Sequence, residues 1–168
     1  MVLHNADHNH YWYAAFLNRL FGRDCFETIE QANKLYDYGN AEYFRMKYSL
    51  ISPTFGRPEE VTEFLESLLS QKHSDFEVVL GDGTPKDTLR PALKKYEENS
   101  IYPLTIIYQE YLPVSDARNE AAKVAKGEYL IFLDSDCLIP ADYLNAVDVF
   151  LESHKVDLFG GPDAARDD

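Results

Sequence analysis

The feature of this sequence that most constrains its fold is an apolar run, residues 129–133, that ends abruptly in Asp134, Ser135 and Asp136. A short apolar run of this kind is typical of a strand that is buried on both faces of a parallel sheet. Ligands of open α/β sheets bind beyond the carboxyl ends of such strands. We therefore expect the two carboxylates, one residue apart, to lie where a ligand binds.

The acidic pair has two interpretations. Carboxylate oxygens are the ligands that Mg²⁺ and Mn²⁺ prefer, and two of them leave coordination positions for a diphosphate and water. Asp and Ser are also ordinary turn-forming residues, so the same letters follow many strands that bind nothing. Other parts of the sequence are needed to distinguish a metal site at Asp134 and Asp136 from an ordinary turn.

Strand and helix patterns alternate along the chain from residue 48 onward. Strands are expected over residues 48–52, 76–81, 104–108, 129–133 and 156–159. Amphipathic helices are expected between them, and the first shows its apolar side at Val61, Phe64, Leu65, Leu68 and Leu69. This alternation predicts an α/β fold with a mostly parallel sheet and helices on both faces.

Several helix ends carry sequence signals. Pro58 and Pro140 suit the first turn of the helices that they open. A helix of residues 116–125 could be capped by Ser115 and closed by Gly127. Another helix is expected over residues 87–97.

Composition excludes several classes of protein. The chain has 168 residues and a formal net charge of −13, which disfavours binding to nucleic acid and to anionic lipid. No apolar run approaches the roughly 20 residues that a membrane span needs. Cys25 and Cys137 form neither a disulfide framework nor a zinc spacing. We expect reduced thiols and a cytoplasmic protein, with Cys137 in a packing role.

Residues 1–47 are expected to form a helical N-terminal extension of unknown role. Two helices are predicted, over residues 11–21 and 27–38, and the nearby His4 and His8 are interpreted as part of a solvated tail. The aromatic side of the first helix could lie at the inner face of a membrane. Its small positive charge favours packing on the domain or on a partner instead.

Polar residues follow three of the predicted strands. They are Pro53 and Thr54, Asp82, and the pair Asp134 and Asp136. Strand ends on one edge of a parallel sheet converge, so these side chains are expected to share one crevice. A carboxylate such as Asp82 can accept the N–H of a uracil or guanine ring. Arg118 could offset phosphate charge there, although each residue alone also fits an ordinary turn or a surface ion pair.

The chain resembles the family 2 glycosyltransferases of the GT-A fold. The resemblance rests on five motifs in order, over roughly residues 48–162: residues 52–58 (SPTFGRP), 75–79 (DFEVV), 82–84 (DGT), 117–121 (ARNEA) and 127–136 (GEYLIFLDSD). It implies the transfer of a sugar from a UDP- or GDP-linked donor to an unknown glycan or lipid-linked acceptor, as in polysaccharide biosynthesis. It also implies inversion at the anomeric carbon and a divalent metal, Mn²⁺ or Mg²⁺.

The resemblance assigns roles by position. Asp134 and Asp136 would form the DXD pair that holds the metal, with Asp136 the stronger candidate for direct contact, and Asp82 would contact the base. The remaining candidates for nucleotide-sugar binding are Pro53, Thr54, Phe55, Arg57, Arg118 and Ser135.

Two departures from the family pattern matter. Many members have two acidic residues where this chain has Gly81 and a single Asp82, so the family position that Asp82 matches stays open. In this family the catalytic base lies in the C-terminal half, so the resemblance implies a base downstream of Asp168. Asp163, Asp167 and Asp168 fit a frayed, Asp-rich terminus better than a catalytic role. We therefore expect residues 48–168 to be the donor-binding part of a longer domain.

Other functions remain open at this level. A phosphatase with Asp134 as nucleophile also uses an apolar strand that ends in Asp-x-Asp, but Leu138 stands where such enzymes carry Thr or Val. The chain could also be a non-catalytic nucleotide-sugar-binding or assembly module. A purely structural protein would instead use the aromatic helix around Trp12 as its interface. A dehydrogenase is disfavoured because no Gly-x-Gly-x-x-Gly follows the first strand.

Overall fold

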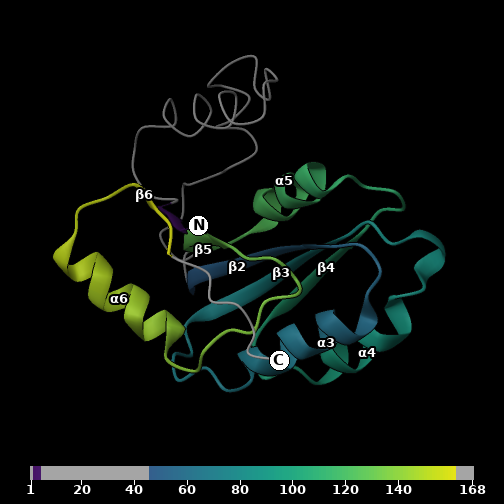
Figure 1. Cartoon of the computed structure of the whole chain (residues 1–168), viewed down its shortest axis with the longest axis horizontal. Helices are drawn as coiled ribbons and strands as arrows, with labels where there is room; N and C mark the ends of the chain where they lie inside the picture. The colour runs from purple at the N-terminus through teal and green to yellow at the C-terminus, as the bar shows by residue number, and fades with distance from the viewer. Residues whose placement is uncertain (1, 5–45, 162–168) are drawn as a thin grey trace, which may run out of the picture.

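The computed structural model describes residues 2–4 and 46–161. Its strands join in one six-stranded sheet with the order β4-β3-β2-β5-β1-β6 (Figure 1). The strands are β1 (Val2–His4), β2 (Met46–Thr54), β3 (Phe76–Asp82), β4 (Leu104–Tyr108), β5 (Gly127–Phe132) and β6 (Leu158–Phe159). The helices are α3 (Pro58–Leu68), the short 3₁₀ turn η1 (Pro85–Asp87), α4 (Arg90–Asn99), α5 (Val114–Val124) and α6 (Tyr143–Ser153).

Four adjacent strands of the sheet run parallel. β2 pairs with β3 on one side and with β5 on the other, and β3 pairs with β4. This arrangement confirms the predicted α/β fold with a mostly parallel sheet. It also brings the carboxyl ends of these four strands to the same edge.

The other end of the sheet differs from the expectation. β1 runs antiparallel to both β5 and β6, between them, although residues 1–47 were expected to be a helical extension. β6 has two residues where a strand of residues 156–159 was expected, because only these residues find partners on the three-residue β1. The predicted helices of residues 11–21 and 27–38, and Cys25, lie outside the described residues.

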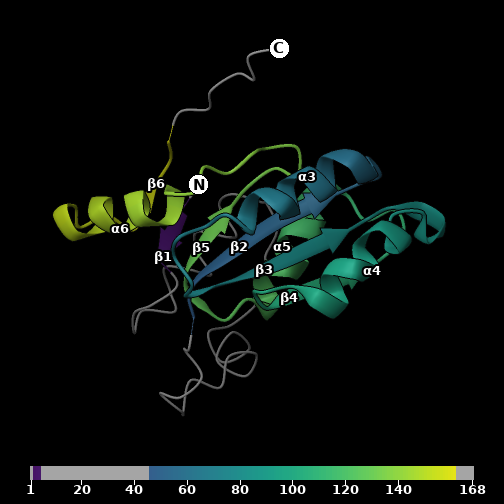
Figure 2. The same cartoon turned by 90° about the horizontal axis from the view of Figure 1, so that it is seen from below.

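Helices cover both faces of the sheet. α5 lies on one face, and α3 and α4 lie on the other with α6 (Figures 1 and 2). Alternating residues of each strand serve the two sides: Leu50 packs toward α3, α4 and α6, whereas Ile51 packs toward α5. Successive residues of a strand point to opposite faces, so a strand covered on both faces must be apolar at nearly every position.

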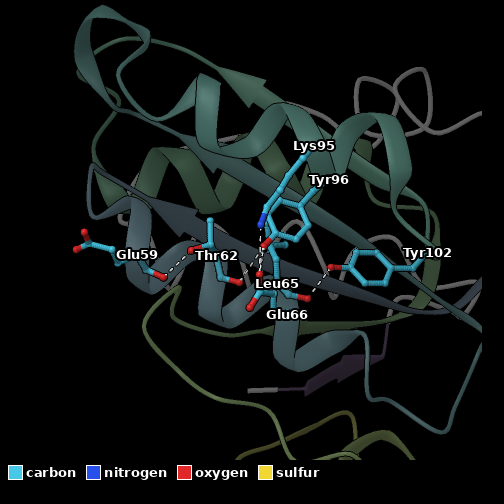
Figure 3. A network of polar contacts seen from close by, with 7 residues as sticks. All are labelled: Glu59, Thr62, Leu65, Glu66, Lys95, Tyr96 and Tyr102. Atoms are coloured by element: carbon cyan, nitrogen blue, oxygen red, sulfur yellow. Dashed lines mark hydrogen bonds and ion pairs between the residues drawn. The ribbon is translucent and has the colours of Figure 1, made fainter.

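α3 follows its amphipathic pattern closely. Val61, Phe64, Leu65 and Leu68 are buried, whereas Leu69 follows the last turn and is partly exposed. Tyr96 of α4 donates a hydrogen bond to Glu66 of α3 at 2.8 Å (Figure 3). The Tyr102 hydroxyl donates to the Leu65 carbonyl at 2.9 Å. These contacts fix α4 and the residues that follow it against α3.

The start and end of α5 correct two predictions. Pro113, not Ser115, stands at the N-cap, and no side chain caps the helix. Gly127 does not close the helix; it begins β5. A Cβ atom there would lie 2.4 Å from the backbone nitrogen of Ser49, so the glycine is needed for strand packing rather than for a helix cap.

The amino edge of the sheet carries an ionic cluster around Asp148 of α6. Lys47 approaches its carboxylate at 2.6 Å and His73 at 3.2 Å, and the buried Tyr48 hydroxyl donates to it. Burial acts to raise the pKa of Asp148, but the bonds from Lys47 and Tyr48 outweigh it and hold that pKa below its usual value. This cluster ties α6 to the start of β2, at the end of the sheet opposite the predicted site.

Candidate functional site

The strand register brings the predicted site residues together. Thr54 and Asp82 are the last residues of β2 and β3 and are paired across the sheet, and Asp82 pairs in turn with Tyr108 of β4. On the other side of β2, Leu133 donates its N–H to the Ile51 carbonyl at 2.9 Å, just before Asp134. The candidate residues after β2, β3 and β5 therefore lie along one edge.

Asp82 is buried, with 1% of its surface exposed. Its Oδ1 accepts the N–H of Thr84 at 2.9 Å, the usual geometry of an Asx turn. Burial also raises the pKa of the neighbouring Tyr108; the Glu97 and Asp82 carboxylates act in the same direction, and Arg90, 4.1 Å from the ring centroid, opposes them. The Asp82 carboxylate is therefore buried at this edge of the sheet and held in a fixed orientation.

The loops that follow β2 and β3 are hydrogen-bonded to one another. Gly83 donates its N–H to the Thr54 carbonyl at 3.0 Å, and Gly56 donates its N–H to the Thr84 hydroxyl at 2.6 Å. Pro53 is buried beside this contact, whereas Phe55 is 52% exposed. Backbone contacts thus hold the predicted nucleoside-binding segment in place.

The two carboxylates after β5 are exposed, Asp134 by 61% and Asp136 by 52% of their side chains. Asp134 forms an ion pair with Arg118 of α5, and Asp136 lies 3.4 Å from Arg57. Ser135, between them, is half-buried. The structure therefore joins four of the predicted residues, from three separate segments, into one charged cluster.

The segment after the acidic pair is anchored to α3 and to the residues that follow this helix. Ile139 donates its N–H to the Ser67 hydroxyl at 3.1 Å, and Gln71 donates to the Pro140 carbonyl at 2.5 Å. Lys72 donates its N–H to the Ala141 carbonyl at 3.0 Å. Cys137 packs against the core, as expected. The acidic turn is thus held between β5 and a helix.

The acidic pair has the donor chemistry that Mg²⁺ or Mn²⁺ requires. Within residues 2–4 and 46–161, no group of three or more His, Cys, Asp or Glu side chains could hold a metal by itself. Two exposed carboxylates fit a cation that takes its remaining oxygen ligands from a bound diphosphate and water. The residues present are therefore compatible with a metal that binds together with a substrate.

Two features of this edge were not among the predicted site residues. The Thr84 hydroxyl joins two loops, and Tyr111 follows β4 with a left-handed backbone. Thr84 belongs to the Asp-Gly-Thr motif, so its position was visible in the sequence, but a turn sequence does not reveal which group its hydroxyl contacts.

In the described part of the chain, no helix has the length and apolar character to cross a bilayer.

Comparison with protein families gives one match that covers most of the chain. Residues 49–166 match the family described as Glycosyl transferase family 2. An uncharacterized glycosyltransferase of Haemophilus influenzae is 31% identical over 116 residues, which are 68% of this chain and 38% of that protein. The poly(ribitol-phosphate) beta-N-acetylglucosaminyltransferase TarS of Staphylococcus aureus is 31% identical over 115 residues, 67% of this chain and 20% of TarS.

Solved structures show the same fold. TarS residues 1–349 in complex with UDP-GlcNAc superpose with a TM-score of 0.55 and 31% identity, over 70% of this chain and 37% of that one. A mannosyltransferase of Pyrobaculum calidifontis, in complex with GDP-Man and Mn²⁺, superposes with a TM-score of 0.55 and 24% identity, over 82% of this chain and 41% of that one. The chain thus spans about a fifth to two fifths of the length of these relatives.

Proposed function

Because the chain belongs to glycosyl transferase family 2, we propose that the carboxyl edge of its sheet binds the donor of a sugar transfer, a nucleoside-diphosphate sugar. One observation carries this proposal: a buried carboxylate, Asp82, shares the edge with two exposed carboxylates, Asp134 and Asp136, that are each paired with an arginine. The buried carboxylate suits a neutral base, and the exposed carboxylates with their two arginines suit a diphosphate that binds together with a divalent metal.

The base end of the site lies around Asp82. Since its Oδ1 already accepts the Thr84 N–H, the carboxylate is oriented before a ligand arrives. A carboxylate can accept the ring N–H of uracil or guanine, and Pro53 and Thr54 lie beside it on β2. Structures of the relative TarS with UDP and with UDP-GlcNAc, at 30% and 31% identity, support a uridine donor.

The diphosphate end lies at Asp134 and Asp136, which would hold Mn²⁺ or Mg²⁺. When bound, the metal would supply Lewis-acid stabilisation of the charge on the departing diphosphate. Arg118 and Arg57 neutralise these carboxylates in the absence of a ligand. With a donor present, the same two guanidinium groups would offset phosphate charge, and Ser135 would lie within this end of the site.

The rest of the reaction is also part of the proposal. An acceptor hydroxyl would displace the nucleoside diphosphate with inversion, and the base that takes its proton would lie outside the described residues. The acceptor would be a glycan or a lipid-linked molecule, in the cytoplasm or at the inner face of the membrane. Residues 48–168 would then form the donor-binding part of a domain.

Calorimetric titration of UDP, GDP and ADP into the purified chain tests donor binding. With Mn²⁺ present we expect saturable binding of UDP, tighter than that of GDP, in line with the uridine donor proposed above. Binding of ADP should be much weaker than that of UDP, because Asp82 can pair with a ring N–H that uracil and guanine have and adenine lacks. Removal of the metal with EDTA should weaken binding by at least about tenfold, since metal bridges supply several kcal/mol. No binding of UDP or GDP by the folded chain would contradict the proposal.

The phosphatase alternative predicts a different result. In that case Asp134 would become phosphorylated after incubation with acetyl phosphate, and Asp134→Asn would abolish the signal. The ion pair of Asp134 with Arg118 and the family match favour a donor site instead. A non-catalytic binding module would share the donor site and differ only in the absence of sugar transfer.

A further inference from the structure

Left-handed backbone conformations gather on the loops at this edge of the sheet. Within the described residues, three residues other than glycine have positive φ: Arg57 at 54°, Lys86 at 59° and Tyr111 at 59°. They follow β2, β3 and β4, three adjacent strands of the sheet. A residue other than glycine in the left-handed conformation raises the free energy of the folded state. Such strain persists only where the surrounding structure holds it, and it is concentrated at binding sites.

Tyr111 is the least expected of the three, because an aromatic side chain rarely adopts this conformation. Its backbone is held against the loop that carries Asp82. Tyr111 donates its N–H to the Gly83 carbonyl at 2.8 Å, and Gln109 donates its N–H to the Asp82 carbonyl at 3.0 Å. The left-handed turn thus fixes Tyr111 one residue away from the proposed base-binding carboxylate.

The contact between the two loops is reinforced by a side chain. Glu110 accepts the N–H of Lys86 at 3.0 Å, so three hydrogen bonds join the loop after β4 to the end of β3 and the loop that follows it. Leu112, the residue after Tyr111, is buried and anchors the loop in the protein. The Tyr111 side chain, by contrast, is 65% exposed, so packing of its ring does not explain why the strain is kept.

The order of the strands places aromatic residues on both sides of Asp82. β3 lies between β2 and β4 in the sheet. Phe55 follows β2 and is 52% exposed, and Tyr111 follows β4. Two exposed aromatic rings thus follow the strands on either side of the one that ends in the proposed base-binding carboxylate.

We propose that the ring of Tyr111 stacks on the nucleobase of the donor and determines how tightly the base is bound. This inference rests on the proposed function and adds a residue to the site. An aromatic ring on a base is worth about 1–3 kcal/mol when it is removed by substitution, and such stacking depends little on which base is present. Tyr111 would therefore strengthen binding of UDP and GDP alike, while Asp82 would discriminate between bases.

The test compares variants that separate the ring from the strain. Tyr111→Gly removes both, Tyr111→Phe keeps both, and Lys86→Gly relieves the same strain on the neighbouring loop without removing a ring. With Mn²⁺ present, we expect Tyr111→Gly to lower the affinity for UDP and for GDP by about tenfold, because the ring is lost. The same variant should have a higher melting temperature, because glycine adopts the left-handed conformation without strain. Pyrophosphate, which has no base, should bind to wild type and Tyr111→Gly equally.

The controls give each outcome a meaning. Tyr111→Phe should bind UDP like wild type, and Lys86→Gly should gain stability without losing affinity. Unchanged UDP affinity in Tyr111→Gly would overturn this inference while leaving the donor site intact. An equal loss of pyrophosphate affinity would also overturn it, because the effect would not depend on the base. Absence of UDP binding to the folded wild-type chain would overturn the proposed function and this inference with it.

Discussion

Replacing Asp136 with alanine should abolish the Mn²⁺-dependent part of UDP binding. We expect affinity to fall by about 100-fold or more, which corresponds to roughly 2.7 kcal/mol and lies within the several kcal/mol that a metal bridge supplies. The Asp136 carboxylate is 52% exposed, and exposed ion pairs contribute little to stability, so the substitution should leave the fold intact. Calorimetric titration with and without Mn²⁺ measures the effect.

Asp142→Ala is the matched control. Asp142 is another exposed aspartate, six residues further along, and forms an ion pair with Lys72 at 2.9 Å. Both variants should unfold within about 0.5 kcal/mol of wild type, because exposed ion pairs contribute little to stability. Equal UDP affinity in the two variants would contradict a metal-binding role for Asp136.

Replacing Gly81 with alanine should destabilise the protein by about 2–3 kcal/mol and also weaken nucleotide binding. A Cβ atom at this position would lie 2.5 Å from the carbonyl oxygen and 2.9 Å from the carbonyl carbon of Ala117 in α5. Those are backbone atoms, so the helix itself has to move. Arg118 follows directly in the chain and pairs with Asp134, so this movement would reach the diphosphate end of the site.

Urea denaturation measures the stability effect, and Gly160→Ala is the control. Nothing lies within 4 Å of a Cβ atom built on Gly160, and its backbone is not left-handed, so the control should unfold like wild type. A Gly81→Ala protein as stable as Gly160→Ala would show that α5 can shift without cost. Unchanged UDP affinity in a destabilised Gly81→Ala would separate the packing of α5 from the site.

The parallel sheet was predictable because its strands are buried on both faces. β3, Phe76–Asp82, is buried at every position, and the strand predicted over residues 76–81 differs from it by one residue. Helical patterns separate the strands of the sheet, and the predicted limits of the edge strand β4, Leu104–Tyr108, match the observed ones. β1 was not predictable in the same way. A three-residue strand has no measurable period, and it exists through its partners on β5 and β6, which are distant in the sequence.

The placement of the candidate residues along one edge was predictable as far as it depends on strand ends. Thr54, Asp82 and Asp134 follow from the rule that ligands bind at the carboxyl edge of a parallel sheet. The connections between the loops were not predictable, because a Ser or Thr in a turn has several possible partners. The left-handed Tyr111 was missed for a stronger reason: local preference argues against an aromatic residue there, and only the loop contacts overcome it.

The most direct test of a donor site at the carboxyl edge is hydrogen–deuterium exchange of the chain with and without UDP and Mn²⁺. We predict slower exchange in three separate segments, residues 54–57, 82–86 and 134–137, and little change around Asp148 at the opposite edge of the sheet. Protection confined to the region of Asp148, or UDP binding that leaves all three segments unchanged, would contradict the account.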